Sequence, residues 1–438
     1  MNNITTEIKD INKNLDYEFR DFTKSKILAF SENRKHAFES FDKLGFPTKK
    51  NEEWKYCDVS PIVKSQLKFE ASSAQNKITA ADLSSLSFLN EGFLIVFENG
   101  KWNHQLSSIN NLPQGLFIQN LSDASENEFV KNHFSKYIDF NHHEFAALNT
   151  AFMIDGTFVH VAPKTKIEKP VYIINIVSDQ SQAVTSNCRN LIVAEKFSEI
   201  KISFITLSQN EKVNGFVNVV NELVALENSN LEFDFIQNDN QFVHQVSNTY
   251  VYQKRDSKFT INTISFGGNI VRNNLNLMLD DENIESHLYG LYVANGNELI
   301  DNHTAVHHAK PHCNSNQLYK GIIDEKATGV FNGKIFVYKD AQKTNAYQSN
   351  KNILLSNDAN MYAKPQLEIY ADDVKCSHGA TTGQLDDEAL FYLRARGINK
   401  SDAQGLLNFA FASDVLNNIT IEALHNYSVN LLSEKLKK

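Results

Sequence analysis

The longest uniform stretch of this chain, residues 157–370, consists of short runs of β-branched and aromatic residues. Turns rich in Asn, Gly, Asp and Lys separate the runs, which is the pattern of successive β-strands. Helical patterns of about 10–15 residues, which would be expected between the strands of βαβ units, do not interrupt them. The stretch therefore predicts a large β core built without helical crossovers.

Similar short segments recur inside this stretch at intervals close to 30 residues. The intervals are 30, 31 and 32 for three pairs of segments: Leu288-Tyr289 and Leu318-Tyr319, Gln317 and Gln348, and residues 323–327 and 355–359. A drifting repeat made only of strands and turns is typical of a parallel β-helix, in which each coil stacks on the previous one. A β-sandwich is the competing architecture, but it needs hairpin turns about every 8–12 residues, and Asn-Gly or Gly-Gly pairs are few here.

The β-helix is expected to occupy residues 151–382. Before it, residues 1–150 show helical spacing of apolar residues, and Asn99-Gly100 between two apolar runs is a hairpin signal. We therefore predict a mainly helical N-terminal domain that contains a small β-hairpin.

The pattern becomes helical again over residues 383–438. Asp386 has the position of a helix N-cap, and Ser401 and Gln404 have the spacing of a capping box. A small helical domain at the end of a solenoid is suited to docking a partner. The predicted fold class is mainly β, a parallel β-helix core flanked by an α-rich N-terminal domain and a small C-terminal helical domain.

Composition excludes several classes of function. The net charge of −9 and the absence of Lys/Arg blocks argue against a nucleic-acid-binding protein. The first ten residues contain no apolar run, so no secretory signal is expected, and no apolar run is long enough to cross a membrane. The cysteines are scattered and predict no disulfide framework, which indicates a cytoplasmic protein. They are Cys57, Cys188, Cys313 and Cys376.

Cys376 and His378 lie where the β pattern gives way to helices. They are separated by one residue, so in an extended strand they point to the same face. A thiol and an imidazole are ligands suited to iron, zinc and copper. Two ligands do not complete a metal site, and the alternative interpretation is that Cys376 is a small core residue and His378 ends the strand.

A second cluster of metal-ligand types occupies residues 301–313. It contains His303, His307, His308, His312 and Cys313. In a strand, His303, His307 and Cys313 would share one face, while His308 and His312 would share the other, which splits the ligand set. A stand-alone metal carrier is one hypothesis for this cluster, and surface turn histidines are the alternative.

Motifs for common catalytic chemistry do not occur in the sequence. The sequence lacks G-x-S-x-G, the Walker A pattern and a G-x-G-x-x-G that opens a helix. No motif therefore indicates nucleophilic hydrolysis, ATP turnover or dinucleotide chemistry. A carbohydrate-active β-helix enzyme remains an alternative, because carboxylates on neighbouring coils could face one groove.

Residues 371–398, ADDVKCSHGATTGQLDDEALFYLRARGI, resemble the signature of the SufB/SufD family, and its SufD branch in particular. The resemblance extends through residues 319–356 and 364–373. Residues 145–161 and the segment KNEEWKY at residues 50–56 also resemble the family. The similarity thus covers most of the chain; it is strong from about residue 300 to 398 and looser before residue 150.

This resemblance implies a non-catalytic scaffold subunit of a SUF iron–sulfur cluster assembly complex, built on a right-handed parallel β-helix. It implies pairing with a SufB paralogue through the β-helices and with the SufC ATPase through the C-terminal helices. The family's cluster-related histidine falls on His378. One chain has too few thiolates to hold a cluster, so His378 is expected to be a cluster ligand shared at the SufB interface. Cys376, on the same face, is the second candidate.

The same resemblance implies that no cofactor is stably bound and that an iron–sulfur cluster is present only transiently at the subunit interface. SufB has an acidic residue where this chain has Gly379, and it has a cysteine that residues 359–361 do not supply. Both departures place the chain on the SufD side of the family. For the isolated chain a homodimer is a further expectation, because an exposed solenoid edge can pair with a copy of itself.

Overall fold

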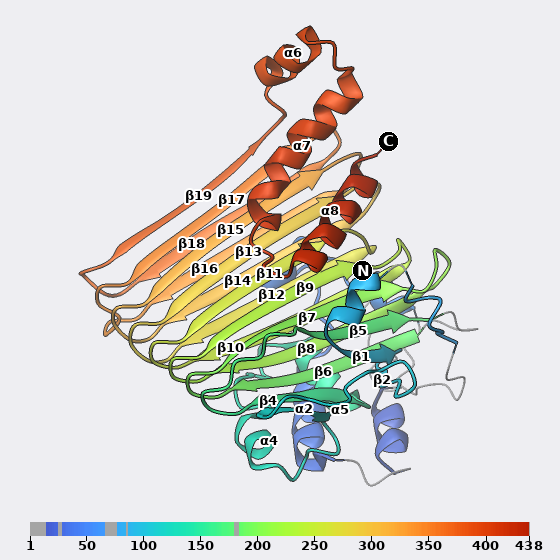
Figure 1. Ribbon diagram of the computed structural model, residues 1–438, viewed down its shortest axis with the longest axis vertical. Helices are drawn as coiled ribbons and strands as arrows, with labels where there is room; N and C mark the ends of the chain where they lie inside the picture. Colours follow the sequence, from blue (N-terminus) through green and yellow to red (C-terminus); the bar gives the residue numbers. More distant parts are fainter. Residues whose placement is uncertain (1–14, 25–28, 66–76, 85, 179–183, 438) are drawn as a thin grey trace.

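The structure is a computed structural model that describes residues 15–24, 29–65, 77–84, 86–178 and 184–437. Its centre is a parallel β-solenoid in which each coil gives one strand to each of two sheets (Figure 1). Odd-numbered strands from β5 to β19 lie in sheet A, and even-numbered strands from β4 to β18 lie in sheet B. The predicted fold class, a mainly β protein with a parallel solenoid core and helices at both ends of the chain, is confirmed.

Nineteen strands are present among the described residues. Those of sheet A are β1 (Phe93–Glu98), β2 (Lys101–Trp102), β5 (Val171–Val177), β7 (Glu199–Ser208), β9 (Asn230–Asn238), β11 (Lys258–Ser265), β13 (Glu285–Ala294), β15 (Asn314–Ile323), β17 (Asn345–Leu354) and β19 (Lys375–Gly383). Those of sheet B are β3 (Leu116–Asn120), β4 (Gly156–Val161), β6 (Val184–Ala194), β8 (Gly215–Ala225), β10 (Val243–Gln253), β12 (Ile270–Leu279), β14 (Leu299–His308), β16 (Thr328–Val337) and β18 (Asn360–Ile369).

The register of neighbouring coils agrees with the sequence repeat in part. Gln317 pairs with Gln348, at the interval of 31 that the sequence indicates. Leu318, however, pairs with Tyr289, so the proposed alignment of Leu288 with Leu318 is wrong by one residue. The slip matters because Leu288 is buried in the solenoid core, whereas Leu318 lies on the outer face of sheet A.

The space between the two sheets is filled by a continuous apolar core. Alternate residues of each strand point into it, and rings from successive coils pack together, as Phe204 and Phe235 do with their centroids 5.5 Å apart. Each fully buried Val, Leu, Ile or Phe side chain contributes about 1.5–3 kcal/mol to folding. The solenoid is therefore held chiefly by this core and by the backbone ladders of the coils.

The N-terminal part of the chain covers the outer face of sheet B and closes the first coil. Asn149 donates hydrogen bonds to the carbonyls of Cys188 and Asn218, which fixes α5 on the sheet. β1 pairs with β5 and turns back into β2 at Asn99-Gly100, while β3 pairs antiparallel with β4. Residues 15–24 are helical, and the labelled helices of this part are α2 (Ser31–Leu44), η1 (Glu52–Trp54), α3 (Ser60–Lys64), η2 (Ser87–Glu91), α4 (Glu128–His133) and α5 (Glu144–Phe152).

Three helices follow the last strand: α6 (Asp387–Ala395), α7 (Lys400–Leu416) and α8 (Glu422–Leu436). α7 and α8 fold back over the outer face of sheet A, and α6 projects beyond β19 (Figure 1). Asp386 caps α6 by accepting from the amides of Glu388 and Ala389, as predicted. The capping box at Ser401 is wrong, because Asn399 is the N-cap of α7 and accepts from the amide of Asp402. No helix among the described residues is long and apolar enough to span a membrane.

Candidate functional site

The solenoid ends in two strands that each have only one neighbour in the described structure. β18 pairs with β16, β19 pairs with β17, and their other edges carry no strand. The core continues into this last coil, since Leu367 and Ile369 stand in register on the buried Ile335 and Val337. The solenoid thus ends with apolar side chains and unpaired backbone groups facing outward.

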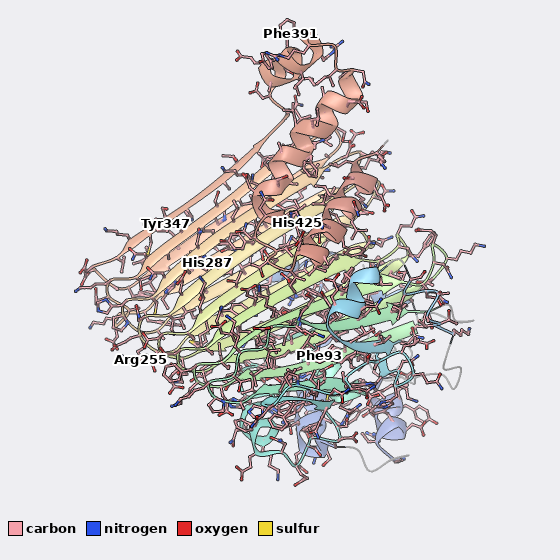
Figure 2. The ribbon with its side chains drawn as sticks, in the orientation of Figure 1. Phe93, Arg255, His287, Tyr347, Phe391 and His425 are labelled. Carbon is pink, nitrogen blue, oxygen red and sulfur yellow. The ribbon has the colours of Figure 1, made fainter. Side chains whose placement is uncertain are left out.

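Large apolar side chains surround this open end. Tyr347 is labelled on the last coils in Figure 2. The exposed members of this rim are Tyr338, Tyr347, Tyr362, Ile369 and Tyr370. Monomeric proteins usually protect an edge strand with charges or proline, but after Lys375 the strand β19 contains neither. An unprotected edge with an aromatic rim is typical of a surface that pairs with another protein.

Cys376 and His378 both point toward the inside of the solenoid at this open end. In the parallel register, Cys376 stands on Ala346 and His378 stands on Gln348, and both residues of β17 are buried on the core side. The two predicted ligands therefore share the inner face of β19, where no further coil covers them.

The surroundings of the two side chains differ. Cys376 is partly buried against the apolar cluster formed with Ala346, Ala371 and Leu367. Burial raises the pKa of its thiol, so the thiolate that binds metals is disfavoured at neutral pH. His378 is exposed and stands above a polar column instead. Of the two, His378 has the environment better suited to a ligand.

An iron–sulfur cluster does not fit the residues of this chain alone. Clusters are usually held by four thiolates, whereas the open end has one thiol and one imidazole. Cys57, Cys188 and Cys313 are buried elsewhere. The part of the chain that the structure describes contains no group of three or more His, Cys, Asp or Glu that could hold a metal ion. A cluster bound here would need ligands from a facing protein.

The structure does not bring the histidines of residues 301–313 together with Cys313. His303 and His307 lie on the outer face of β14, and His308 is buried on its inner face beside Ser315. His312 is in a turn, so the alternative of surface turn histidines describes this residue and not the other three. The prediction that Cys313 shares a face with His303 is wrong, because the strand ends at His308 and the turn directs the thiol into the core.

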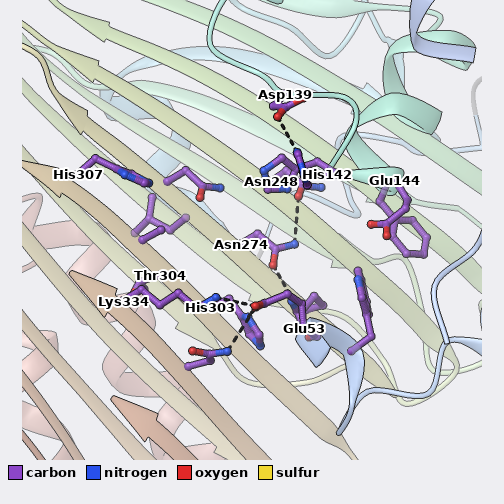
Figure 3. Close-up of a pocket in the computed structure, with 18 of the residues that line it drawn as sticks. Glu53, Asp139, His142, Glu144, Asn248, Asn274, His303, Thr304, His307 and Lys334 are labelled. Atoms are coloured by element: carbon purple, nitrogen blue, oxygen red, sulfur yellow. Dashed lines mark hydrogen bonds and ion pairs between the residues drawn. The ribbon is translucent and has the colours of Figure 1, made fainter. Parts of the chain in front are cut away.

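A cleft of about 500 Å³ lies on the outer face of sheet B, beneath segments of the N-terminal part (Figure 3). Glu53 projects over it and contacts Lys334 at 2.5 Å and His303 at 3.2 Å. The hydrogen bond from His303 holds the pKa of Glu53 well below its usual range, and Lys334 adds to this effect. His303 also contacts Asp301 at 3.0 Å, so an imidazole lies between two carboxylates.

Residues 52–56 cross the outer face of four successive coils. The ring of Trp54 lies 4.3 Å from the guanidinium of Arg272 on β12, and Glu53 reaches β14 and β16. Glu52 contacts Lys364 on β18 at 2.7 Å. Tyr56 stacks on Tyr362 of the same strand with ring centroids 4.2 Å apart. We call residues 52–56 the strap, because they tie the N-terminal part to the last coil.

The floor of the cleft does not have the chemistry of a glycosidase. The strands beneath it present Asn274, His303, His307 and Lys334 to the cavity, and its carboxylates Glu53, Asp139 and Glu144 come from the N-terminal segments. Carboxylates contributed by neighbouring coils, which the carbohydrate-active alternative requires, are not among the lining residues. The sequence indicates a loop-like joint here, with Trp54 and Tyr56 as surface anchors, but it indicates neither the cleft nor the charged contacts of the strap with the coils.

A second exposed apolar surface lies on the C-terminal helices. α6 buries none of its residues, and Phe391 is 74% exposed at the tip of the projection (Figure 2). Tyr392 lies beside it, and Leu406 and Phe409 on α7 are also exposed. A helix with this composition and so little packing is typical of a docking element.

Fold and surfaces together define an open-ended parallel β-solenoid protein with two exposed apolar surfaces. Residues 175–411 match the family model described as SUF system FeS cluster assembly, SufBD core domain, and residues 16–173 match the SufBD protein N-terminal region. The chain therefore belongs to the SufBD family, whose members take part in iron–sulfur cluster assembly.

Curated relatives share similarity along nearly the whole chain. An iron–sulfur cluster assembly SufBD family protein of Synechocystis sp. is 32% identical over 92% of this chain and 90% of its own length. The iron–sulfur cluster assembly protein SufD of Escherichia coli is 29% identical over 90% of both chains. SufD of Bacillus subtilis is 27% identical over 74% of both chains. The resemblance seen in the sequence is thus confirmed.

Proposed function

We propose that this chain is a non-catalytic scaffold subunit of a SufBCD-type complex. It pairs through the open end of its solenoid with a SufB paralogue and through its C-terminal helices with the SufC ATPase. The observation that carries the proposal is the unfinished last coil, in which no strand covers the outer edges of β18 and β19, and β19 has neither an acidic residue nor a proline to protect its edge. A partner with the same fold continues both sheets and covers the core.

In this proposal the iron–sulfur cluster is cargo, held transiently between the two solenoid ends. His378 is a ligand from this chain, Cys376 is the second candidate, and the partner supplies the remaining ligands. Support comes from the position of both side chains on the inner face of β19, directed at the joint. The buried polar column beneath His378 further distinguishes it from Cys376.

The SufC ATPase is assigned to α6 and the adjoining part of α7. Exposed Phe391, Tyr392, Leu406 and Phe409 supply an apolar surface of the kind that anchors a helix in the groove of another protein. The four cysteines form no disulfide, which suits the reducing cytoplasm where we place the complex.

Co-expression with SufB and SufC tests the two surfaces separately. The double variant Ile369→Asp/Tyr370→Asp should lose SufB and keep SufC, because a charge is placed on the solenoid edge. Phe391→Asp/Tyr392→Asp should lose SufC and keep SufB. Phe242→Asp is the matched control, since Phe242 is 47% exposed but lies away from both surfaces, and this variant should keep both partners. If the wild-type chain co-purifies with neither protein, the proposal is wrong.

Cluster binding is tested in the intact complex. His378→Ala should leave the subunits together but lower the iron and sulfide content after reconstitution, and Cys376→Ala should have a smaller effect. Unchanged cluster content in His378→Ala would remove His378 from the site. Light scattering of the chain alone determines whether the same edge forms a homodimer when SufB is absent.

A further inference from the structure

A column of polar side chains runs inside the solenoid to the open end. Gln317, Gln348 and His378 are in register on β15, β17 and β19, and all three lie on the inner faces of their strands. Gln317 and Gln348 are almost completely buried. Buried amides are costly unless their hydrogen bonds are satisfied, so the partners of each amide atom are informative.

The hydrogen bonds of this column run in one direction. Gln317 donates through Nε2 to Oγ1 of Thr304 at 2.6 Å, and Gln348 donates through Nε2 to Oε1 of Gln317 at 2.9 Å. The carbonyl oxygen Oε1 of Gln348 is buried and has no hydrogen-bond partner in the described structure. The column therefore ends in an unused acceptor one strand below His378.

The position of the Gln348 amide depends on a glycine in the opposite sheet. A Cβ atom added to Gly333 on β16 would lie 2.4 Å from Nε2 of Gln348 and 2.8 Å from its Cδ. Any larger residue at this position would push the amide out of the column. The absence of a side chain at Gly333 therefore leaves the space that keeps the Gln348 amide bonded to Gln317.

We propose that Gln348 is a positioning residue for His378. Its carbonyl oxygen accepts a hydrogen bond from one ring nitrogen of His378, which fixes the tautomer and leaves the other nitrogen unprotonated to bind iron. Adjacent strands are about 4.7–4.9 Å apart, so side chains in register on one face can make such a bond. Histidine ligands commonly donate their second ring N–H to a carbonyl or carboxylate in this way.

The inference rests on the proposed role of His378 and deepens it. Cys376 has no equivalent support, because it stands on the methyl group of Ala346 within an apolar cluster. The polar column beneath His378 and the apolar cluster around Cys376 thus explain why the imidazole, and not the neighbouring thiol, is prepared to act as a ligand from this chain.

Nuclear magnetic resonance of the full chain labelled with ¹⁵N-histidine tests the inference without any cluster. The His378 signals are assigned by their loss in His378→Ala. In the wild type at pH 8 their ¹⁵N shifts should report one dominant tautomer. Gln348→Leu should give a mixture of tautomers. Gln348→Glu should restore the single form, because burial favours its protonated carboxyl, whose O–H can donate to Oε1 of Gln317 while the other oxygen accepts from His378. Gly333→Ala should resemble Gln348→Leu, because it displaces the same amide.

Asn350→Leu is the matched control. Asn350 is buried two residues further along β17 and stands below Ala380, so its loss disturbs the core to a similar extent without touching the column. It should leave the His378 tautomer unchanged. If Gln348→Leu and Gln348→Glu both leave the His378 signals as in the wild type, Gln348 is not a positioning residue.

The complex with SufB and SufC supplies a second readout. Loss of the supporting hydrogen bond should weaken iron binding in Gln348→Leu by about 10-fold or more, while Gln348→Glu should bind iron nearly as the wild type does. If the tautomer changes as expected but His378→Ala retains a full cluster, the proposed role of His378 fails and the positioning by Gln348 stands.

Discussion

The ammonium group of Lys320 on β15 lies 2.5 Å from the carboxylate of Asp414 on α7. The lysine side chain is 3% exposed, whereas that of Asp414 is 64% exposed. Lys320 also donates to the carbonyl of Phe411 at 2.8 Å, and its charge lies over the ring of that residue. A buried cation on the solenoid thus fixes the position of the helix that carries the proposed SufC surface.

Removal of the two partners should have unequal effects. Asp414→Ala leaves a buried ammonium without its counter-ion and should lower the free energy of unfolding by about 1–3 kcal/mol. Lys320→Met keeps the apolar stem, removes the buried charge and leaves only an exposed carboxylate, so it should lower the free energy of unfolding by less. Urea unfolding of both variants measures which substitution lowers this free energy more. A larger loss in Lys320→Met would contradict this account.

The strap should be stabilised by the charge of Glu53. Glu53→Gln should destabilise the chain by about 1 kcal/mol, because the contact with Lys334 is partly exposed. The pKa of Glu53 is lower in the folded chain than the unfolded value of about 4.3. The contribution of this carboxylate is therefore complete above that pH and is lost as the pH falls toward the folded pKa.

Thermal unfolding of the wild type and Glu53→Gln at pH 7 and pH 3.5 checks this prediction. The difference in melting temperature between the wild type and Glu53→Gln should become smaller at the lower pH and in high salt. Glu52→Gln is the matched control one residue away, and its effect should be smaller because the contact with Lys364 is more exposed. A difference that grows on acidification would contradict the assigned role of Glu53.

The solenoid could be predicted from sequence because its coils repeat polar turns and stack side chains in register. The pair Gln317 and Gln348 is recognisable for this reason. The exact register could not be predicted, because the coil length varies. Gln245 pairs with Val271, 26 residues later, whereas Gly156 pairs with Arg189, 33 residues later. A period averaged over such coils gives the architecture and not the residue pairs.

The candidate sites could be predicted only where they follow from local strand alternation. Cys376 and His378 share a face because they are two residues apart in one strand. Strand alternation does not predict the direction of the Cys313 side chain, because β14 ends at His308 and Cys313 follows a turn. The strap depends on contacts such as that of Glu53 with Lys334, between residues far apart in sequence, and no spacing rule indicates such pairs.

His308 should make the chain less stable in acid. Burial lowers the pKa of its imidazole to about 3, whereas the unfolded value is about 6.5. Below pH 6.5 the unfolded chain binds a proton that the folded chain does not bind. The stability that His308 contributes therefore falls by about 1.4 kcal/mol for each pH unit between 6.5 and the folded pKa.

The His308→Gln variant isolates this contribution. Asp234 and Asp239 are buried, and burial raises their pKa values to about 7 and about 6, so they oppose the histidine in the same pH range. The informative quantity is thus the difference in unfolding free energy between the wild type and His308→Gln. Urea titrations at pH 8, 6 and 5 should show the variant gaining stability relative to the wild type as the pH falls. A constant difference would contradict the prediction.

Alkylation of cysteines should locate the proposed SufB interface directly. Cys57, Cys188 and Cys313 are buried, and burial raises the pKa of Cys188 to about 12 and that of Cys313 to about 11. Cys376 is partly exposed on the open end, and its pKa is raised by burial. Because the thiolate is the reactive form, iodoacetamide should modify Cys376 first, slowly at pH 7 and faster at pH 9.

Binding of SufB should protect Cys376, because the partner covers the inner face of β19, whereas binding of SufC to α6 should not. Mass spectrometry of the alkylated peptides measures both effects, and Cys376→Ala identifies the modified site. The Ile369→Asp/Tyr370→Asp variant should abolish protection by SufB while leaving the intrinsic rate at Cys376 similar. Equal alkylation of Cys376 with and without bound SufB would mean that the partner contacts another part of the solenoid.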